Sequence, residues 1–124
     1  MFEFLVDSIS PKGLVLGRNG SRNIPVGTTF TSVRLSRAQR GPSEINMEDL
    51  GEVATVAMTL REVHWYQRTI EHVPDGHTAG LAVSGNGLEV LAGLLRDLPK
   101  NDYLSLTAPA SQDTQPNSAS DGGK

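Results

Sequence analysis

Short runs in which apolar and polar residues alternate, separated by turn-forming residues, dominate the first hundred positions of the chain. At the start, Phe2, Phe4 and Val6 alternate with polar neighbours, and Leu5 interrupts that alternation. Such a period of two predicts a β-strand with one buried face. Similar short runs occupy residues 14–16, 28–35, 78–84 and 103–106. Because glycine- and proline-containing turns separate them, the pattern predicts an all-β domain.

The longest strand-like stretch runs from Val53 to the turn at Pro74-Asp75-Gly76. Its apolar residues change parity part of the way along: Val56, Met58 and Leu60 share one parity, and Val63 and Trp65 share the other. A flat strand cannot make that change without exchanging its faces, so a bulge or bend is predicted at Arg61-Glu62. With that bulge, Trp65 points inward and Tyr66 outward.

Three segments do not fit the strand pattern. Residues 38–52 are mostly polar and contain Gly41-Pro42, which predicts a surface loop with at most one short helical turn. Residues 88–95 (LEVLAGLL) fit either a strand or a short helix. Residues 107–124 lack large apolar side chains, which predicts a disordered tail. The folded domain is therefore expected to span residues 1–106, with an inserted loop at 38–52.

Length and composition fit one soluble domain. A chain of 124 residues can bury a single core. It has no cysteine, so disulfides and thiolate metal sites are ruled out. The first residues do not resemble a signal peptide, and no apolar run reaches the roughly 20 residues that span a bilayer. These features predict a cytoplasmic protein without membrane attachment.

Charge is distributed unevenly along the chain, although the formal net charge is only −3. Six basic residues and no acid lie between Ser8 and Ser43: Lys12, Arg18, Arg22, Arg34, Arg37 and Arg40. Four acids follow within residues 44–52. This basic third of the chain, residues 8–43, could contact phosphate, pair with these acids or remain solvated. The sequence leaves all three possibilities open.

The order of the glycine turns resembles domain II of the translational GTPases, the β-barrel domain of elongation factor Tu and its relatives. The resemblance is carried by residues 12–20 (KGLVLGRNG), 24–27 (IPVG), 63–64 (VH), 70–85 (IEHVPDGHTAGLAVSG) and 99–104 (PKNDYL). In the last of these, Asn101 stands where the family has glycine. The resemblance covers most of residues 2–106 and implies a single closed antiparallel β-barrel of six to seven strands. It also implies a docking module that contacts RNA or a ribosome-associated protein.

Catalytic and metal-binding motifs are missing from the sequence. There is no Gly-x-x-x-x-Gly-Lys-Ser/Thr loop for nucleotide phosphates and no Gly-x-Ser-x-Gly nucleophile motif. The three histidines are spaced poorly for a shared ion, since His64 and His72 lie roughly 27 Å apart along a straight strand. We therefore expect no enzyme activity, no cofactor and no metal.

The sequence supports three hypotheses of function. The first is a stand-alone, non-catalytic module that docks RNA or a ribosome-associated complex. Its candidate contacts are Arg18, Arg22, Arg34, Arg37, Arg40, Tyr66 and Arg68. The second, favoured by the overall acidity, is a protein-interaction or regulatory module with no role in nucleic-acid binding. The third is a small hydrolase with an unrecognised site.

Overall fold

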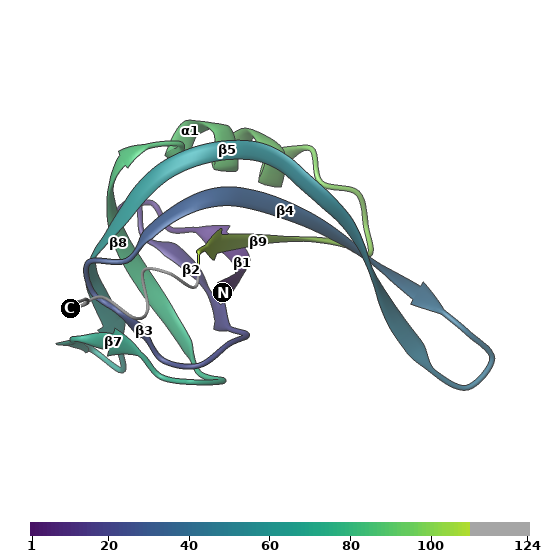
Figure 1. Cartoon of the computed structure of the whole chain (residues 1–124), viewed down its shortest axis with the longest axis horizontal. Helices are drawn as coiled ribbons and strands as arrows, with labels where there is room; N and C mark the ends of the chain where they lie inside the picture. Colours follow the sequence, from purple (N-terminus) through teal and green to yellow (C-terminus); the bar gives the residue numbers. More distant parts are fainter. Residues whose placement is uncertain (110–124) are drawn as a thin grey trace, which may run out of the picture.

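A computed structural model describes residues 1–109 of the chain, and β-strands make up most of this part (Figure 1). The strands are β1 (Phe2–Ile9), β2 (Val15–Asn19), β3 (Ile24–Pro25), β4 (Thr29–Arg40), β5 (Ile45–Trp65), β6 (Arg68–Ile70), β7 (His72–Val73), β8 (Thr78–Asn86) and β9 (Asp102–Ala108). One helix, α1 (Leu88–Arg96), connects β8 to β9 within the described residues. The prediction of a mostly β, antiparallel domain is confirmed.

Six strands are joined into a ring. The large sheet has the order β4-β9-β1-β2-β8-β5-β6, and β4 also pairs with β5. That additional pairing links the first and sixth strands of the order, and β6 extends beyond the ring as an edge strand. β3 and β7 form a separate two-stranded sheet, and all the pairings are antiparallel.

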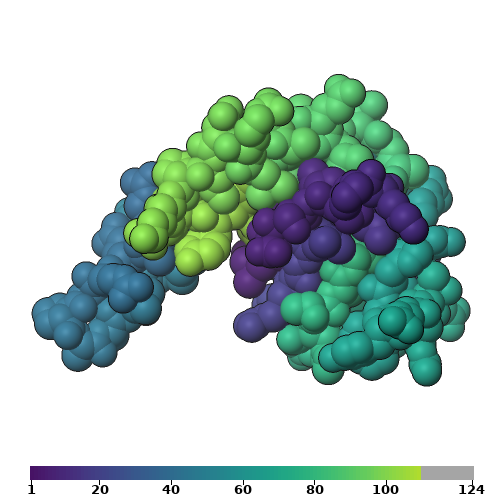
Figure 2. Space-filling view, turned by 180° about the vertical axis from the view of Figure 1, so that it is seen from behind, coloured from purple at the N-terminus to yellow at the C-terminus, as the bar shows by residue number. Residues whose placement is uncertain are grey.

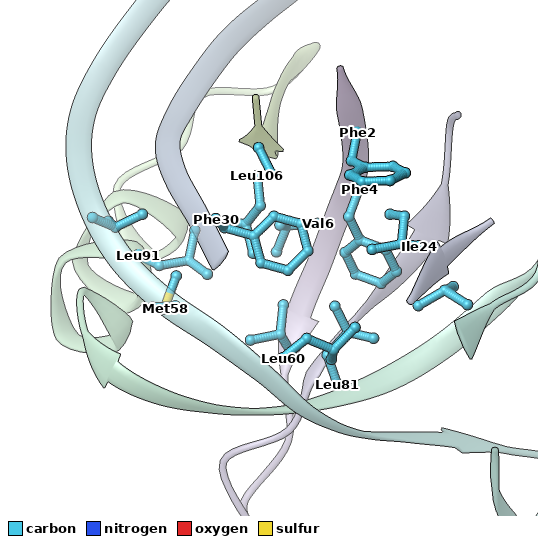
Figure 3. Close-up of a cluster of buried hydrophobic side chains, with 14 of the residues drawn as sticks. Phe2, Phe4, Val6, Ile24, Phe30, Met58, Leu60, Leu81, Leu91 and Leu106 are labelled. Atoms are coloured by element: carbon cyan, nitrogen blue, oxygen red, sulfur yellow. The ribbon is translucent and has the colours of Figure 1, made fainter. Parts of the chain in front are cut away.

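The core lies inside this ring, as the buried side chains in Figure 3 show. Phe2, Phe4 and Val6 of β1 point inward, as their alternation predicts. They belong to the same cluster as Phe30 of β4 and Leu91 of α1. Burying such side chains contributes roughly 1.5–3 kcal/mol each, so the ring is held mainly by its interior.

The bulge predicted in the long strand is confirmed. In the β5–β8 pairing, Leu60 lies opposite Val83 and Glu62 opposite Ala82, which leaves Arg61 as an extra residue on β5. The apolar residues on both sides of the bulge, Val56, Met58, Leu60 and Val63, are all buried. The change of parity is therefore absorbed by one inserted residue.

The same strand was expected to continue as far as Pro74, and that expectation is wrong. β5 ends at Trp65, and the chain turns back into β6, with Trp65 paired to Arg68. Tyr66 and Gln67 form the two-residue turn with φ values of 50° and 65°. Turns of this kind usually contain Asn-Gly, so Tyr-Gln carried no sequence signal for a reversal.

The loop predicted at residues 38–52 is also wrong, because this segment extends β4 and β5 as a hairpin that projects from the body (Figure 1). We call residues 36–49 the arm. Arg40 pairs with Ile45 and Arg37 with Glu48, so the connection is only four residues long. No residue of the arm is buried. A hairpin that faces solvent on both sides has no need of an apolar–polar contrast, which explains why its sequence resembles a loop.

Two boundaries become definite in the structure. Residues 88–95, left open between strand and helix, are helical, and Leu91 of this helix is buried. The last strand continues past Thr107 to Ala108, because β9 pairs with β1 on one side and β4 on the other. The predicted tail therefore begins too early by these two residues, and residues 110–124 lie outside the described part of the chain.

Candidate binding groove

Two rows of outward-facing side chains cross the strands on the face opposite the core. The register places Leu5 beside Arg18 and Arg18 beside Thr78 in one row. In the other row, Leu16 and His64 both lie beside Gly80. Because paired residues in a sheet point to the same side, each row forms a continuous strip. Leu5 and Leu16 are thus apolar residues on the outer face.

These rows form the floor of a surface groove of about 780 Å³. Met47 of the arm and Tyr103 of β9 line it on one side, and Trp65 and Tyr66 line it at the β5–β6 turn. Figure 2 shows the arm (residues 36–49, blue) separated from the body by a hollow. The groove therefore crosses β9, β1, β2 and β8, from the arm to the β5–β6 turn.

Aromatic rings gather at the β5–β6 end of the groove. The rings of Trp65 and Tyr66 meet edge-to-face, with centroids 4.6 Å apart and an interplanar angle of 73°. Trp65 also meets His77 edge-to-face at 5.7 Å. Tyr66 is 74% exposed, as its predicted outward orientation requires. Trp65, predicted to point inward, is half-buried and lines the groove instead of joining the core. Among the described residues, Trp65 Nε1 is buried and has no hydrogen-bond partner.

The arm presents different residues on its two faces. Ala38 pairs with Met47 and Arg40 with Ile45, so these four share one face. The opposite face is polar, and there Gln39 donates a hydrogen bond to Glu48. Met47 is 53% exposed and points from the first face into the groove. The arm therefore contributes an apolar side chain to the groove.

Two of the candidate arginines are already paired with acids. Arg37 donates from Nε to Asp102 Oδ1 at 2.8 Å and from Nη2 to Asp102 Oδ2 at 3.1 Å. Arg34 Nη2 donates to Asp49 Oδ2 at 2.9 Å, so one of the acids in residues 44–52 does pair with the basic third. Pairing therefore accounts for part of the basic cluster.

These contacts lower the pKa values of both carboxyl groups, Asp49 and Asp102. The Arg37 hydrogen bonds lower the pKa of Asp102, against its burial, which raises it. The Gly51 N–H lowers the pKa of Asp49 most, and the Arg34 hydrogen bond adds to it. Each carboxylate is therefore held in its charged form by its partners.

The remaining candidate residues are dispersed. Arg18 lines the groove together with Tyr66, and these are the two predicted contacts that the groove brings together. Arg22 lies over the Phe2 ring, 5.7 Å from its centroid. Arg40 lies next to the turn of the arm, and Arg68 begins the edge strand β6. The seven candidates thus do not form one basic surface.

Sequence reasoning missed four apolar or aromatic groove residues: Leu5, Leu16, Met47 and Tyr103. One signal was present, because Leu5 is apolar at a position where the alternation calls for a polar residue. Met47 gave no signal, since its place depends on the arm being a hairpin.

The described residues show neither a metal cluster nor a membrane-spanning helix. His64 contacts Glu62 at 3.1 Å, and no third metal-binding side chain in residues 1–109 joins this pair. Within the same range, no helix has the length and apolar character needed to cross a membrane.

The fold and the groove together define an all-β domain with a ring of six antiparallel strands and an apolar groove on its outer face. Comparison with protein-family models, curated proteins and solved structures finds no match to the chain.

Proposed function

We propose that the chain is a non-catalytic binding module that holds a segment of a partner protein in the groove. The observation that carries this proposal is the placement of Leu5 and Leu16 on the outer face of the sheet, between Met47 and Tyr66. Covering apolar surface contributes roughly 25 cal/mol per Å², which makes this strip the most favourable place on the groove floor for a partner. Grooves lined by apolar and aromatic side chains are typical binding sites.

The backbone at Tyr66 supports the same proposal. A bulky residue with φ near 50° occupies the left-handed region, at a cost of about 1–2 kcal/mol relative to an ordinary conformation. The turn therefore holds an exposed aromatic ring where Asn or Gly would be more stable. Such strain is common where a side chain is needed for binding.

The distribution of charge favours a protein partner over RNA. RNA affinity comes chiefly from several phosphate contacts made together. Arg34 and Arg37 are engaged by Asp49 and Asp102, and the remaining candidate arginines lie apart. We therefore rank RNA docking through the seven predicted residues below protein binding. In the experiment described below, capture that nuclease abolishes would indicate RNA docking. Nothing in the groove favours the hydrolase hypothesis.

We also propose that the ring of six strands is a closed barrel of the kind found in domain II of the translational GTPases. The order of the glycine motifs supports this likeness. Asn101, at the position of a family glycine, has φ 75°, a conformation that asparagine and glycine adopt most readily. The module would then be such a barrel acting without a nucleotide-binding domain in the same 124 residues.

Affinity capture from the native cell lysate, with and without nuclease, tests the proposed function. The wild-type chain is compared with Leu16→Glu, which places a charge on the groove floor, and with Val90→Glu on α1. We expect a nuclease-resistant protein to be retained by the wild type and by Val90→Glu and lost from Leu16→Glu. Capture that nuclease abolishes, or that Leu16→Glu leaves unchanged, would contradict the proposal. Circular dichroism confirms that both variants are folded.

A further inference from the structure

Arg18 is the one lysine or arginine among the residues that line the groove. It lies between Leu5 and Thr78 in one row of side chains and is exposed. In the part of the chain that the structure describes, no acid pairs with Arg18, whereas Arg34 and Arg37 each have one. An unpaired guanidinium beside apolar side chains is suited to bind a carboxylate from outside.

We propose that the groove binds an extended segment of a partner protein in which an Asp or Glu side chain pairs with Arg18 and apolar side chains flank it. This inference rests on the proposed function and specifies the chemistry of the partner. Leu5 lies directly beside Arg18, and Tyr66 lies beyond it at the end of the groove. Apolar side chains of the partner segment, on both sides of its carboxylate, would cover Leu5 and Tyr66.

The length of the groove sets the length of the segment. It crosses from β9 over β1, β2 and β8 to β5, which is four strand spacings. At about 4.8 Å per spacing this is roughly 19 Å, the length of about six extended residues. The side chains of Leu14 and Leu16 lie over Gly80 in the second row, so the floor is apolar there. An extended segment of about six residues therefore spans the groove.

Two other occupants fit the groove less well. A phosphate backbone would carry negative charge along the whole groove, and Asp7 in the lining would repel it. Residues 110–124 of this chain contain Asp113 and Asp121 but no apolar side chain larger than proline. That composition could satisfy Arg18 and would leave Leu5 and Leu16 uncovered.

Selection from a displayed library of random octapeptides, flanked by linker on both sides, tests this inference on the full chain. Wild type, Arg18→Glu and Lys12→Glu are used as parallel targets. Lys12→Glu makes the same change of charge at an exposed turn residue that does not line the groove. We expect wild type and Lys12→Glu to enrich peptides with one acid flanked by apolar residues. Arg18→Glu should lose these peptides or select a basic residue in place of the acid.

A synthetic peptide from the selection is then compared with its Glu→Gln or Asp→Asn counterpart, with fluorescence anisotropy as the readout. Loss of a charge-assisted contact should weaken binding at least tenfold, about the effect of one such hydrogen-bonded pair. The emission of Trp65 in the groove, the one tryptophan of the chain, gives an independent signal of occupancy.

Four outcomes would overturn the inference. They are enrichment of peptides without an acid, the same peptides from Arg18→Glu, no enrichment with any target, and Arg18-dependent binding of a random 20-nucleotide RNA pool. The first two leave the proposed function standing, because the groove would still bind peptide with a different chemistry. After the third, the lysate capture with Leu16→Glu decides separately whether the groove binds a protein, and the fourth would assign the groove to nucleic acid.

Discussion

Gly17 of β2 and Gly80 of β8 lie at neighbouring positions of the β2–β8 pair, and the space for a side chain differs between them. A Cβ at Gly17 would lie 2.0 Å from the Leu5 carbonyl oxygen and 2.8 Å from the Phe4 ring, both fixed parts of the core sheet. A Cβ at Gly80 would lie 3.1 Å from the end of the Leu16 side chain, which can move. The first glycine is required by packing against the backbone of β1, whereas at the second the neighbouring leucine side chains can adjust.

We predict that Gly17→Ala lowers the free energy of unfolding by at least about 2 kcal/mol, because the backbone of β1 must shift. Gly80→Ala is the matched control and should cost less than about 1 kcal/mol. Urea unfolding monitored through Trp65 emission measures both. An equal loss of unfolding free energy in the two variants would show that the backbone of β1 can shift at little cost.

Tyr66 and Gln67 provide a second prediction at the scale of the residue. Replacing them by Asn and Gly relieves two left-handed residues and should raise the free energy of unfolding by about 1–2 kcal/mol. The same change removes the exposed ring from the groove and should weaken binding of the captured protein. Gln67→Gly alone is the control that keeps the ring. A double variant that is more stable and binds equally well would argue against a role of Tyr66 in binding.

The ion pair between Asp102 and Arg37 makes the stability of the fold depend on pH. Its pKa is lowered in the folded state by Arg37, so its contribution to stability is complete above the unfolded value of about 3.9. That contribution is lost as the pH falls through the lower, folded value. We expect Asp102→Asn to lower the melting temperature at pH 7, and the difference from wild type to shrink below pH of about 4.

Differential scanning calorimetry between pH 2.5 and 7 checks this expectation. Asp75→Asn, at an exposed turn, serves as the control. A difference between wild type and Asp102→Asn that stays constant down to pH 2.5 would show that the ion pair does not stabilise the fold.

At the scale of the element, the alternation of residues predicted the parts that bury one face. β1 and the bulged β5 belong to this class, because Phe4 or Leu60 on one side of the strand contrasts with a polar residue on the other. The arm and the reversal at Tyr66 could not be predicted in the same way. The arm faces water on both sides, and the turn lacks the residues that usually mark it.

The arm also yields a prediction. Replacing residues 38–47 by Asn-Gly keeps Arg37 and Glu48 as the closing pair of a shorter hairpin. Because no arm residue is buried, the melting temperature should fall by less than about 5 °C. Binding in the groove should weaken, since Met47 is lost, and Met47→Ala should reproduce most of that loss. Unfolding of the shortened chain would show that the arm supports the ring.

At the scale of the whole molecule, the sequence predicted the class of fold and only a small part of the site. The ring depends on pairings between strands distant in the sequence, β1 with β9 and β2 with β8, that no local pattern specifies. The groove depends on those pairings too, because they bring Leu5, Arg18 and Tyr66 onto one face. Arg18 and Tyr66 were predicted as contacts, but their apolar neighbours became visible only through the register.

The most direct test of the central claim, that the groove holds a protein partner, is site-specific photo-cross-linking in the native cell. Benzoylphenylalanine is placed at Tyr103, in the groove and 46% exposed, or at Val90, on α1 and 47% exposed. The account predicts a defined protein adduct from position 103 that resists nuclease, and none from position 90. Equal adducts from both positions, or an adduct from position 103 that is RNA, would contradict it.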